Sequence, residues 1–360
     1  MFTSIILVFA ALVFSLQFRP VQTYFAQRLA AYLSEELNTR VAISGLYIQP
    51  FKSLVLEGLY IQDLDKDTLL HAKVLSLNIN ELSLNRRRIS ISTLRLSTAQ
   101  FYLKKYEDKS SNLNFIINYF NTGSPERKER KPFELIFKEI KLDRVTFKYK
   151  NLGVETKVNG INYNDLHIQN LKGIVRDLDT KNNLAKASIK GLSFREKSGF
   201  YLKSLSTLAI IDSNKMEFRG LELITPSSII RNYFVMEFKS FDDFNQFNDR
   251  VYMNGRFSKS RVVSADIAYF APALSKNYFD VKVDGRVSGY VKHLKAQKMN
   301  ILSGEKTVLK GDFSIKGLPV IKNTLFELEF DELATNKKDF ERIIQRISGN
   351  SNSKLPDVFN

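Results

Sequence analysis

Residues 94–103 read LRLSTAQFYL, and residues 75–79 read LSLNI. Residues 75–79 and the short runs at 89–91 (ISI), 94–96 (LRL) and 101–103 (FYL) each have the period of a β-strand with one apolar face, and each run is predicted as a separate strand. Similar short runs recur from Val41 to Phe330, and each is bounded by Gly, Asn, Asp or charged residues. The sequence therefore predicts a mainly β protein in which polar corners of one to three residues join the strands. Such units stack into an elongated, curved sheet rather than a compact sandwich.

Composition limits the classes of function that remain. The chain has 360 residues and a formal net charge of +16, from 54 Lys+Arg against 38 Asp+Glu. This length exceeds one ordinary compact domain, so we expect two domains or one elongated one. The absence of Cys excludes disulfides, thiolate metal sites and cysteine nucleophiles. The positive charge favours anionic partners, either lipid headgroups or nucleic acid. We expect no nucleic-acid partner, because no recognition module with aromatic stacking positions is present.

The first 18 residues, MFTSIILVFAALVFSLQF, carry no charged side chain. About 17 such residues are the lower limit for a membrane-spanning helix, so the sequence predicts a transmembrane anchor over residues 1–18. Its apolar residues are Ile5, Ile6, Leu7, Val8, Phe9, Leu12, Val13 and Phe14. A cleaved signal peptide is an alternative, but it requires a basic start and a small-residue cleavage site, which the sequence lacks. A buried core helix is the third interpretation.

The orientation of this anchor stays open from the residues alone. Arg19, Arg28 and Arg40 follow the span and nothing basic precedes it, so a count of positive charges would leave the body in the cytoplasm. Long following domains translocate largely regardless of charge, which makes this count weak here.

The rest of the chain divides into three predicted parts. Residues 19–39 form an amphipathic helix, which either packs on the following sheet or caps the end of a groove beside the membrane. Residues 40–334 form an elongated β-groove domain, with a charged loop at 121–132 as the best hinge. Residues 335–360 form a helix capped by Thr335 or Asn336, followed by a tail that we expect to be truncated. The apolar face of the first helix comprises Val21, Phe25, Leu29, Tyr32, Leu33 and Leu37.

Motifs for catalysis or metal binding are rejected. Asp63, Asp65 and Asp67 begin like a calcium loop, but Thr68 stands where the loop needs Gly and Val74 where it needs Glu. A solvated turn is therefore expected. The sequence has no Gly-rich phosphate loop, nucleophile elbow or zinc-protease motif, and only three scattered histidines. We predict no enzymatic activity, no metal and no cofactor.

The alternating strands carry the main functional expectation. If the apolar face is closed by a second sheet, it is only a core; if it stays open, it forms a trough for acyl chains. Each methylene removed from water in such a trough contributes about 0.8 kcal/mol. A slip of one residue in register would invert the assignment of faces. The candidate trough residues are Leu75, Leu77, Ile79, Leu94, Leu96, Phe101, Leu103, Val145, Phe147 and Tyr149.

The stretch from Val21 to Ile79 resembles the N-terminal part of TamB-like proteins of the AsmA family, of the type found in Bacteroidetes. The matching order is an anchor, an amphipathic helix ending L-x-T-x-V, and the strand G-L-Y-I. It continues with F-K-x-L-x-L-E-x-L-Y-I-x-D, D-T-L-L and A-K-x-L-x-L. These blocks lie here at Leu37–Val41, Gly45–Ile48, Phe51–Asp63, Asp67–Leu70 and Ala72–Leu77.

This resemblance implies a single-pass inner-membrane anchor with the body in the periplasm. It also implies a taco-shaped β-sheet with an apolar interior, and a role in envelope biogenesis. That role comprises phospholipid transport toward the outer membrane and assistance to an Omp85-type partner in outer-membrane protein assembly. Family members are longer than this chain, so we expect a fragment. The competing expectations are a lipid-free scaffold or adaptor with a closed core, and a parallel β-helix enzyme acting on polysaccharide.

Overall fold

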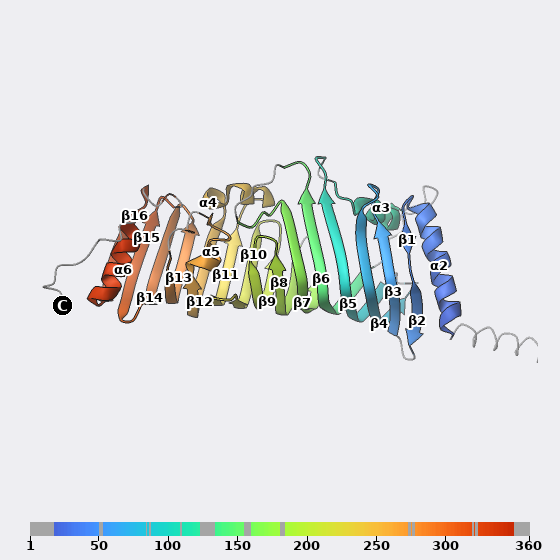
Figure 1. The fold of residues 1–360 in the computed structure, drawn as a ribbon, viewed down its shortest axis with the longest axis horizontal. Coiled ribbons are helices and arrows are strands. Elements are labelled where there is room, and N and C mark those ends of the chain that lie inside the picture. The colour runs from blue at the N-terminus through green and yellow to red at the C-terminus, as the bar shows by residue number, and fades with distance from the viewer. Residues whose placement is uncertain are drawn as a thin grey trace, which may run out of the picture. The chain divides into compact units, whose positions relative to one another are not determined.

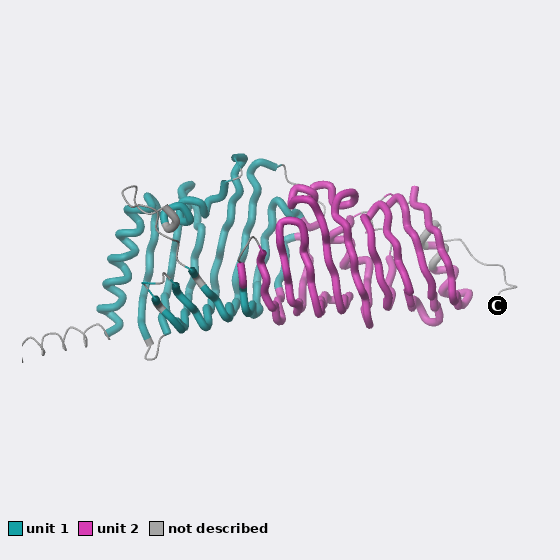
Figure 2. The backbone as a smooth tube through the Cα atoms, turned by 180° about the vertical axis from the view of Figure 1, so that it is seen from behind, with its two compact units in different colours: residues 1–157, 162–178, 194–197 teal, residues 158–161, 179–193, 198–360 magenta. Residues whose placement is uncertain are grey.

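The chain forms two compact units, which Figure 2 distinguishes by colour. Unit 1 comprises residues 1–157, 162–178 and 194–197, and unit 2 comprises residues 158–161, 179–193 and 198–360. The computed structural model describes residues 18–49, 53–83, 85, 88–108, 110–122, 134–154, 160–180, 184–272, 275, 278–318, 320 and 323–348. Sixteen strands and a few short helices occupy these residues, which confirms the expected mainly β class.

Several sequence predictions lie outside the described residues or cross from one unit to the other. Of the anchor predicted over 1–18, residues 1–17 lie outside the described residues; of the hinge loop predicted over 121–132, residues 123–132 do, and residues 121–122 belong to α3. The expected single domain over 40–334 is divided between the two units, and the division falls within residues 157–198. Within the part of the chain that the structure describes, no helix combines the length and the apolar composition needed to cross a membrane.

Unit 1 is built on one sheet whose strands follow the order β1-β3-β4-β5-β6-β7, with β2 also paired to β3 (Figure 1). Neighbouring strands are antiparallel except β5 and β6, which are parallel and have α3 between them in the chain. The elements are α2 (Arg19–Glu36), β1 (Val41–Ala42), β2 (Gly45–Gln49), β3 (Ser53–Gln62), β4 (Thr68–Ser83), β5 (Arg88–Lys105), α3 (Asn114–Thr122), β6 (Glu134–Asn151) and β7 (Asp165–Asp179).

Unit 2 continues the same construction within its own residues. From β9 to β16 each strand pairs antiparallel with the next one in the chain. Its strands are β8 (Ala185–Glu196), β9 (Tyr201–Ile211), β10 (Lys215–Ile224), β11 (Ile229–Glu237), β12 (Tyr252–Val263), β13 (Asp280–Tyr290), β14 (His293–Ser303), β15 (Thr307–Lys316) and β16 (Leu325–Ala334). Its helices are η1 (Phe241–Gln246), α4 (Phe247–Arg250), α5 (Ser264–Ile267) and α6 (Lys337–Ser348).

A predicted polar corner in unit 1 can be a left-handed residue inside one long strand. The runs at 89–91, 94–96 and 101–103 are predicted as three strands, but all lie in β5. Thr98, between the second and third runs, has a left-handed φ of 50°. The pairing of β5 with β4 and with β6 passes through Thr98 without a shift in register, so the strand continues.

Left-handed residues of this kind recur at matching levels of neighbouring strands. In unit 1, Ser97 pairs with Asp143 and Ala99 with Val145, so Thr98 lies opposite Arg144, which has a φ of 52°. Left-handed residues on strands of unit 1 are Gly58, Thr98, Arg144, Asn170, Gly173 and Asp177. Strand residues of unit 2 with positive φ are Gly191, Gly220, Asn232, Lys259, Gly285, Gly289, Lys298 and Gly311.

The helix predictions are met unevenly. The sequence NLNFIINYF at 112–120 fits either a helix or a strand, and it contributes most of helix α3. The sequence ADIAYFAPAL at 265–274 predicts a helix begun by Ser264 and interrupted by Pro272, and the part of it that the structure describes contains the four-residue α5. For α6, the side chain of Asn336 accepts a hydrogen bond from the backbone N–H of Asp339 at 2.7 Å, which confirms Asn336 as its cap.

Candidate functional site

The ten predicted trough residues share one face of the unit 1 sheet. Cross-strand partners lie on the same face, and so do residues two apart within a regular strand. The register joins them across β4, β5 and β6 by the pairs Leu75–Leu96, Leu77–Leu94, Phe101–Phe147, Leu103–Tyr149 and Ala99–Val145. The rings of Phe101 and Phe147 stack with their centroids 6.0 Å apart. We call this surface the apolar face.

The apolar face stays continuous along each strand although its residues do not alternate strictly. Ala72 and Leu75 are three residues apart in β4, and without an irregularity they would point to opposite faces. Both belong to one hydrophobic cluster, as do the pairs Leu96–Ala99 and Leu142–Val145. The buried members of the cluster are Leu59, Ala72, Ala99 and Val145. Three of these follow a left-handed residue directly, so the cluster lies at the level of the left-handed residues.

Burial along the apolar face is incomplete. Val145 is 4% exposed, whereas the other nine predicted residues are half-buried. All the described strands of unit 1 belong to one sheet, so no second sheet of this unit covers them in that part of the chain. The alternation in the sequence identified these apolar residues, but it did not show which strands lie side by side to form one face. The pairing of β5 with β6 joins segments that are far apart in the sequence, and no local pattern indicates it. Residues that the prediction missed on this face include Leu54, Leu56, Ile61, Leu70, Ile140 and Leu142.

One end of the apolar face is covered by helices. A second cluster, formed by Ala30, Leu37 and Val41, packs with Phe115 and Tyr119 of α3. Ile43 and Ile61 contact both this cluster and the central one. The two clusters are therefore continuous, and α2 and α3 close the apolar face at its β1 end (Figure 1).

The opposite face of the same strands is polar. Glu139 in β6 lies across from Arg176 in β7, and the Arg176 Nε donates to its carboxylate at 2.8 Å. Lys141, two residues on, also pairs with Glu139 at 2.8 Å. Hydrogen bonds from Lys141 and Arg176 hold the pKa of Glu139 below its usual value. The sheet of unit 1 thus has one charged side and one apolar side.

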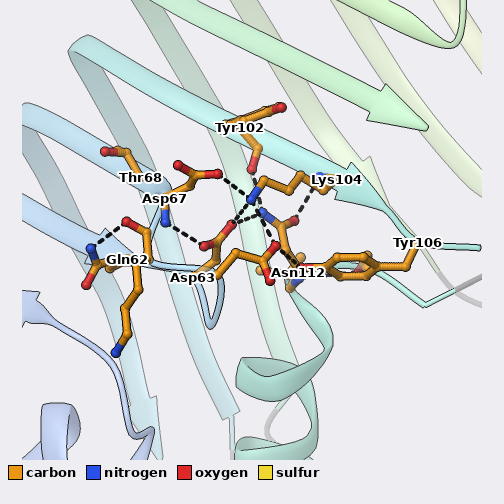
Figure 3. Close-up of polar contacts among 12 residues, drawn as sticks. Gln62, Asp63, Asp67, Thr68, Tyr102, Lys104, Tyr106 and Asn112 are labelled. Atoms are coloured by element: carbon orange, nitrogen blue, oxygen red, sulfur yellow. Dashed lines mark hydrogen bonds and ion pairs between the residues drawn. The ribbon is translucent and has the colours of Figure 1, made fainter. Parts of the chain in front are cut away.

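The expected turn forms with residues 64–67 exposed, and a charged cluster at the edge of unit 1 is built on it (Figure 3). In this turn at 63–67, however, the Asp63 side chain is fully buried. The Lys104 ammonium of β5 pairs with the carboxylates of Asp63, Asp65 and Asp67 at 3.0, 3.0 and 2.6 Å. The cation facing these three carboxylates is therefore a side chain of the protein itself.

Further hydrogen bonds tie this cluster to three elements. The Asn112 amide donates to Asp63 at 2.9 Å and to the Tyr102 carbonyl at 3.0 Å, just before α3 begins. The Thr39 hydroxyl, after α2, donates to the Asp63 carbonyl at 3.1 Å. The cluster joins the β3–β4 turn and β5 to the C-terminal end of α2 and the N-terminal end of α3. It therefore positions these two helices at the β1 end of the apolar face.

Titration shifts follow from this geometry. Burial acts to lower the pKa of Lys104, but hydrogen bonds to Asp67, Asp65 and Asp63 outweigh it and raise the pKa above its ordinary value. Hydrogen bonds from Tyr106 and Lys104 lower the pKa of Asp65. Burial and the hydrogen bond to Asp65 raise the pKa of Tyr106 to about 12. With these shifts, Lys104 is protonated, Asp65 is ionised and Tyr106 is neutral at neutral pH.

Other polar sites are structural. No group of His, Asp or Glu side chains among the described residues is arranged to hold a metal ion. A pocket of about 680 Å³ in unit 2 includes Glu237, Asp243 and Asp249. Asp243 accepts from the backbone N–H of Lys239 at 2.7 Å, and Asp249 pairs with Lys292. Asp243 and Asp249 are thus held by bonds within the protein.

The apolar face can remove hydrocarbon from water, but it carries few groups that could take part in a chemical reaction. The hydroxyl of Tyr149 is the only titratable group among the ten predicted residues, and burial raises its pKa. Phe, Leu, Ile and Val supply the rest of that surface. A search against protein-family models and against curated proteins found no match to this chain.

Proposed function

We propose that this protein is a membrane-anchored envelope-biogenesis protein that binds lipid acyl chains on the apolar face of unit 1. The resemblance to TamB-like proteins of the AsmA family supplies the setting: an inner-membrane anchor and a body in the periplasm. The role is phospholipid transport between membranes, assistance to outer-membrane protein assembly with an Omp85-type partner, or both. No chemical step is part of the proposal.

One observation carries the proposal. The ten residues chosen from alternation alone gather on one face, and nine of them are only half-buried. A closed core would bury such side chains almost completely. Covering a half-buried apolar surface with hydrocarbon lowers the free energy by about 25 cal/mol for each Å² removed from water.

A lipid-free scaffold is the second candidate, and β16 favours it. Every residue of this strand is exposed, including Phe326, Leu328 and Phe330. Within the described residues its hydrogen-bonding partner is β15 alone. An uncovered edge strand is a template for pairing with a strand of another protein.

Site-specific photo-cross-linking separates these candidates. A benzoylphenylalanine at position 101 projects from the apolar face, whereas one at position 100 projects from the opposite face of the same strand. With the full chain in native membranes, we expect phospholipid adducts at position 101 and few at position 100. Equal labelling at the two positions, or no lipid adduct at either, contradicts acyl-chain binding and favours the scaffold.

Lipid content provides the matching mutational test. Phe147→Asp places a charge on the apolar face, and Thr146→Asp places the same charge on the other side one residue earlier. We expect Phe147→Asp to reduce co-purified phospholipid, measured by mass spectrometry, by about tenfold, which requires only about 1.4 kcal/mol of lost binding free energy. Thr146→Asp should retain it. Circular dichroism checks that both variants are folded, and an unchanged lipid content in a folded Phe147→Asp variant refutes the proposal.

A further inference from the structure

Helix α2 carries a stripe of exposed apolar side chains, in which the Tyr32 hydroxyl is also hydrogen-bonded to Tyr119 of α3. Phe18, Phe25, Leu29 and Tyr32 are 53%, 56%, 55% and 52% exposed. They are spaced by seven, four and three residues, which places them on one side of a helix. We call these four residues the interfacial stripe. The sequence grouped Phe25, Leu29 and Tyr32 with a sheet-facing side, but the sheet receives other residues.

The side of α2 that meets the sheet is formed mainly by small and polar residues, with Leu33 packed near its C-terminal end. Its buried residues are Gln22, Ala26 and Ala30. The Gln22 Oε1 accepts from the backbone N–H of Ile48 at 2.8 Å. Near the other end of the helix, the Ser34 hydroxyl accepts from the N–H of Val41 at 2.9 Å.

A third bond fixes the rotation of the helix between these two. The Thr23 hydroxyl accepts from the N–H of Leu46 at 3.1 Å and donates to its carbonyl at 3.2 Å. Turning the interfacial stripe onto the sheet would break these bonds and bury polar groups without partners. The outward orientation of the stripe is therefore built into the fold.

The basic residues of α2 and the uncharged sequence before it indicate which kind of partner covers the interfacial stripe. Residues 1–17 carry no charge, and the first charged residue of the chain, Arg19, begins α2. The Arg28 guanidinium lies on the ring of Tyr24, which is itself 53% exposed beside the stripe. Aromatic rings and arginines flanking an apolar segment are typical of the boundary between acyl chains and headgroups of a membrane.

We infer that α2 lies along the surface of a phospholipid bilayer, with the interfacial stripe among the acyl chains and Arg28 at the headgroups, whereas the Arg19 guanidinium stacks on the Tyr47 ring of β2. This inference rests on the proposed membrane attachment, and it adds which surface of unit 1 meets the bilayer. The β1 end of the sheet, which α2 covers, then lies nearest the membrane (Figure 1).

The absence of tryptophan from the chain makes a direct test possible. Phe25→Trp places the only indole on the interfacial stripe, and Gln27→Trp places it two residues away on another exposed side of α2. Each full-length variant is reconstituted in vesicles of phosphatidylethanolamine and phosphatidylglycerol, with and without phospholipids brominated on their acyl chains. We expect the Phe25→Trp emission to be quenched about twofold or more by bromine, as for a side chain buried at the acyl boundary, and the Gln27→Trp emission to change little.

Leu29→Trp repeats the measurement on the stripe, so a folding defect at one position does not decide the outcome. Equal quenching in the Phe25→Trp and Gln27→Trp variants, or none in either, in a vesicle-bound chain overturns this inference and leaves acyl-chain binding by the apolar face intact. A blue-shifted Phe25→Trp emission that is insensitive to bromine and is lost on dilution also overturns it, in favour of a second copy on the stripe. A chain that does not float with vesicles refutes the membrane attachment as well.

Discussion

Lys104 shows how a single residue changes the meaning of a motif. The triplet Asp63, Asp65 and Asp67 is visible in the sequence, and Thr68 and Val74 depart from the calcium-loop pattern that it begins. The sequence could not show that Lys104, 37 residues after Asp67, supplies the cation. It therefore predicted a solvated turn where Asp63 is fully buried.

Replacing this lysine tests its role. Lys104→Met leaves the Asp63 carboxylate buried without its cation, and breaking a buried pair in this way costs about 3–5 kcal/mol. We expect a lower midpoint of thermal unfolding by circular dichroism, and partial recovery in the double variant Lys104→Met, Asp63→Asn. Lys105→Met, at the next position of β5, is the control. If the two single lysine variants unfold at the same temperature, Lys104 does not stabilise the fold.

At the scale of the strand, the sequence predicted alternation well and strand length badly. A break in alternation predicts a corner, but in β5 it is a left-handed residue, Thr98, within one continuous strand. Gly58 and Gly220 indicate left-handed backbone already in the sequence, because glycine adopts this conformation without strain. Thr98, Arg144 and Lys298 adopt it without any such signal, since cross-strand hydrogen bonds rather than local preference impose the conformation.

Some bulges are stabilised by a carboxylate of the next strand. The backbone N–H of Lys298 in β14 donates to the Asp312 carboxylate of β15 at 2.7 Å, and Lys259 does the same with Asp284 at 2.7 Å. The left-handed residue of one strand is thus held by an acidic residue of its neighbour. This relation is not visible in either strand alone.

We expect Asp312→Ala to lose about 1 kcal/mol of stability, the usual contribution of one hydrogen bond, and to speed hydrogen exchange at the Lys298 amide. Asp312→Asn retains an oxygen acceptor and should keep most of the protection. Exchange measured by mass spectrometry on peptides covering β14 reads out both variants. Protection at Lys298 that is the same in Asp312→Ala as in the parent would contradict this role.

At the scale of the whole molecule, two kinds of lipid contact compete. The net charge of +16 attracts anionic headgroups, by about 1 kcal/mol for each basic side chain near a membrane surface. The apolar face of unit 1 instead attracts the hydrocarbon part of any phospholipid. Both forces would enrich lipid in a purified sample, but only the first depends on charge.

Salt distinguishes the two forces, because about 1 M salt shortens the screening length to about 3 Å and suppresses contacts between exposed charges. Hydrophobic burial is not weakened by such screening, so we expect the phospholipid retained by the full chain to be the same after washing in low or high salt. Its headgroup composition should follow that of the source membrane rather than favour anionic lipids. Phospholipid analysis by mass spectrometry measures both quantities, with Phe147→Asp as the lipid-depleted reference. Lipid that leaves at high salt, or that is mainly anionic, is bound by the basic side chains, and the apolar face is then not what retains it.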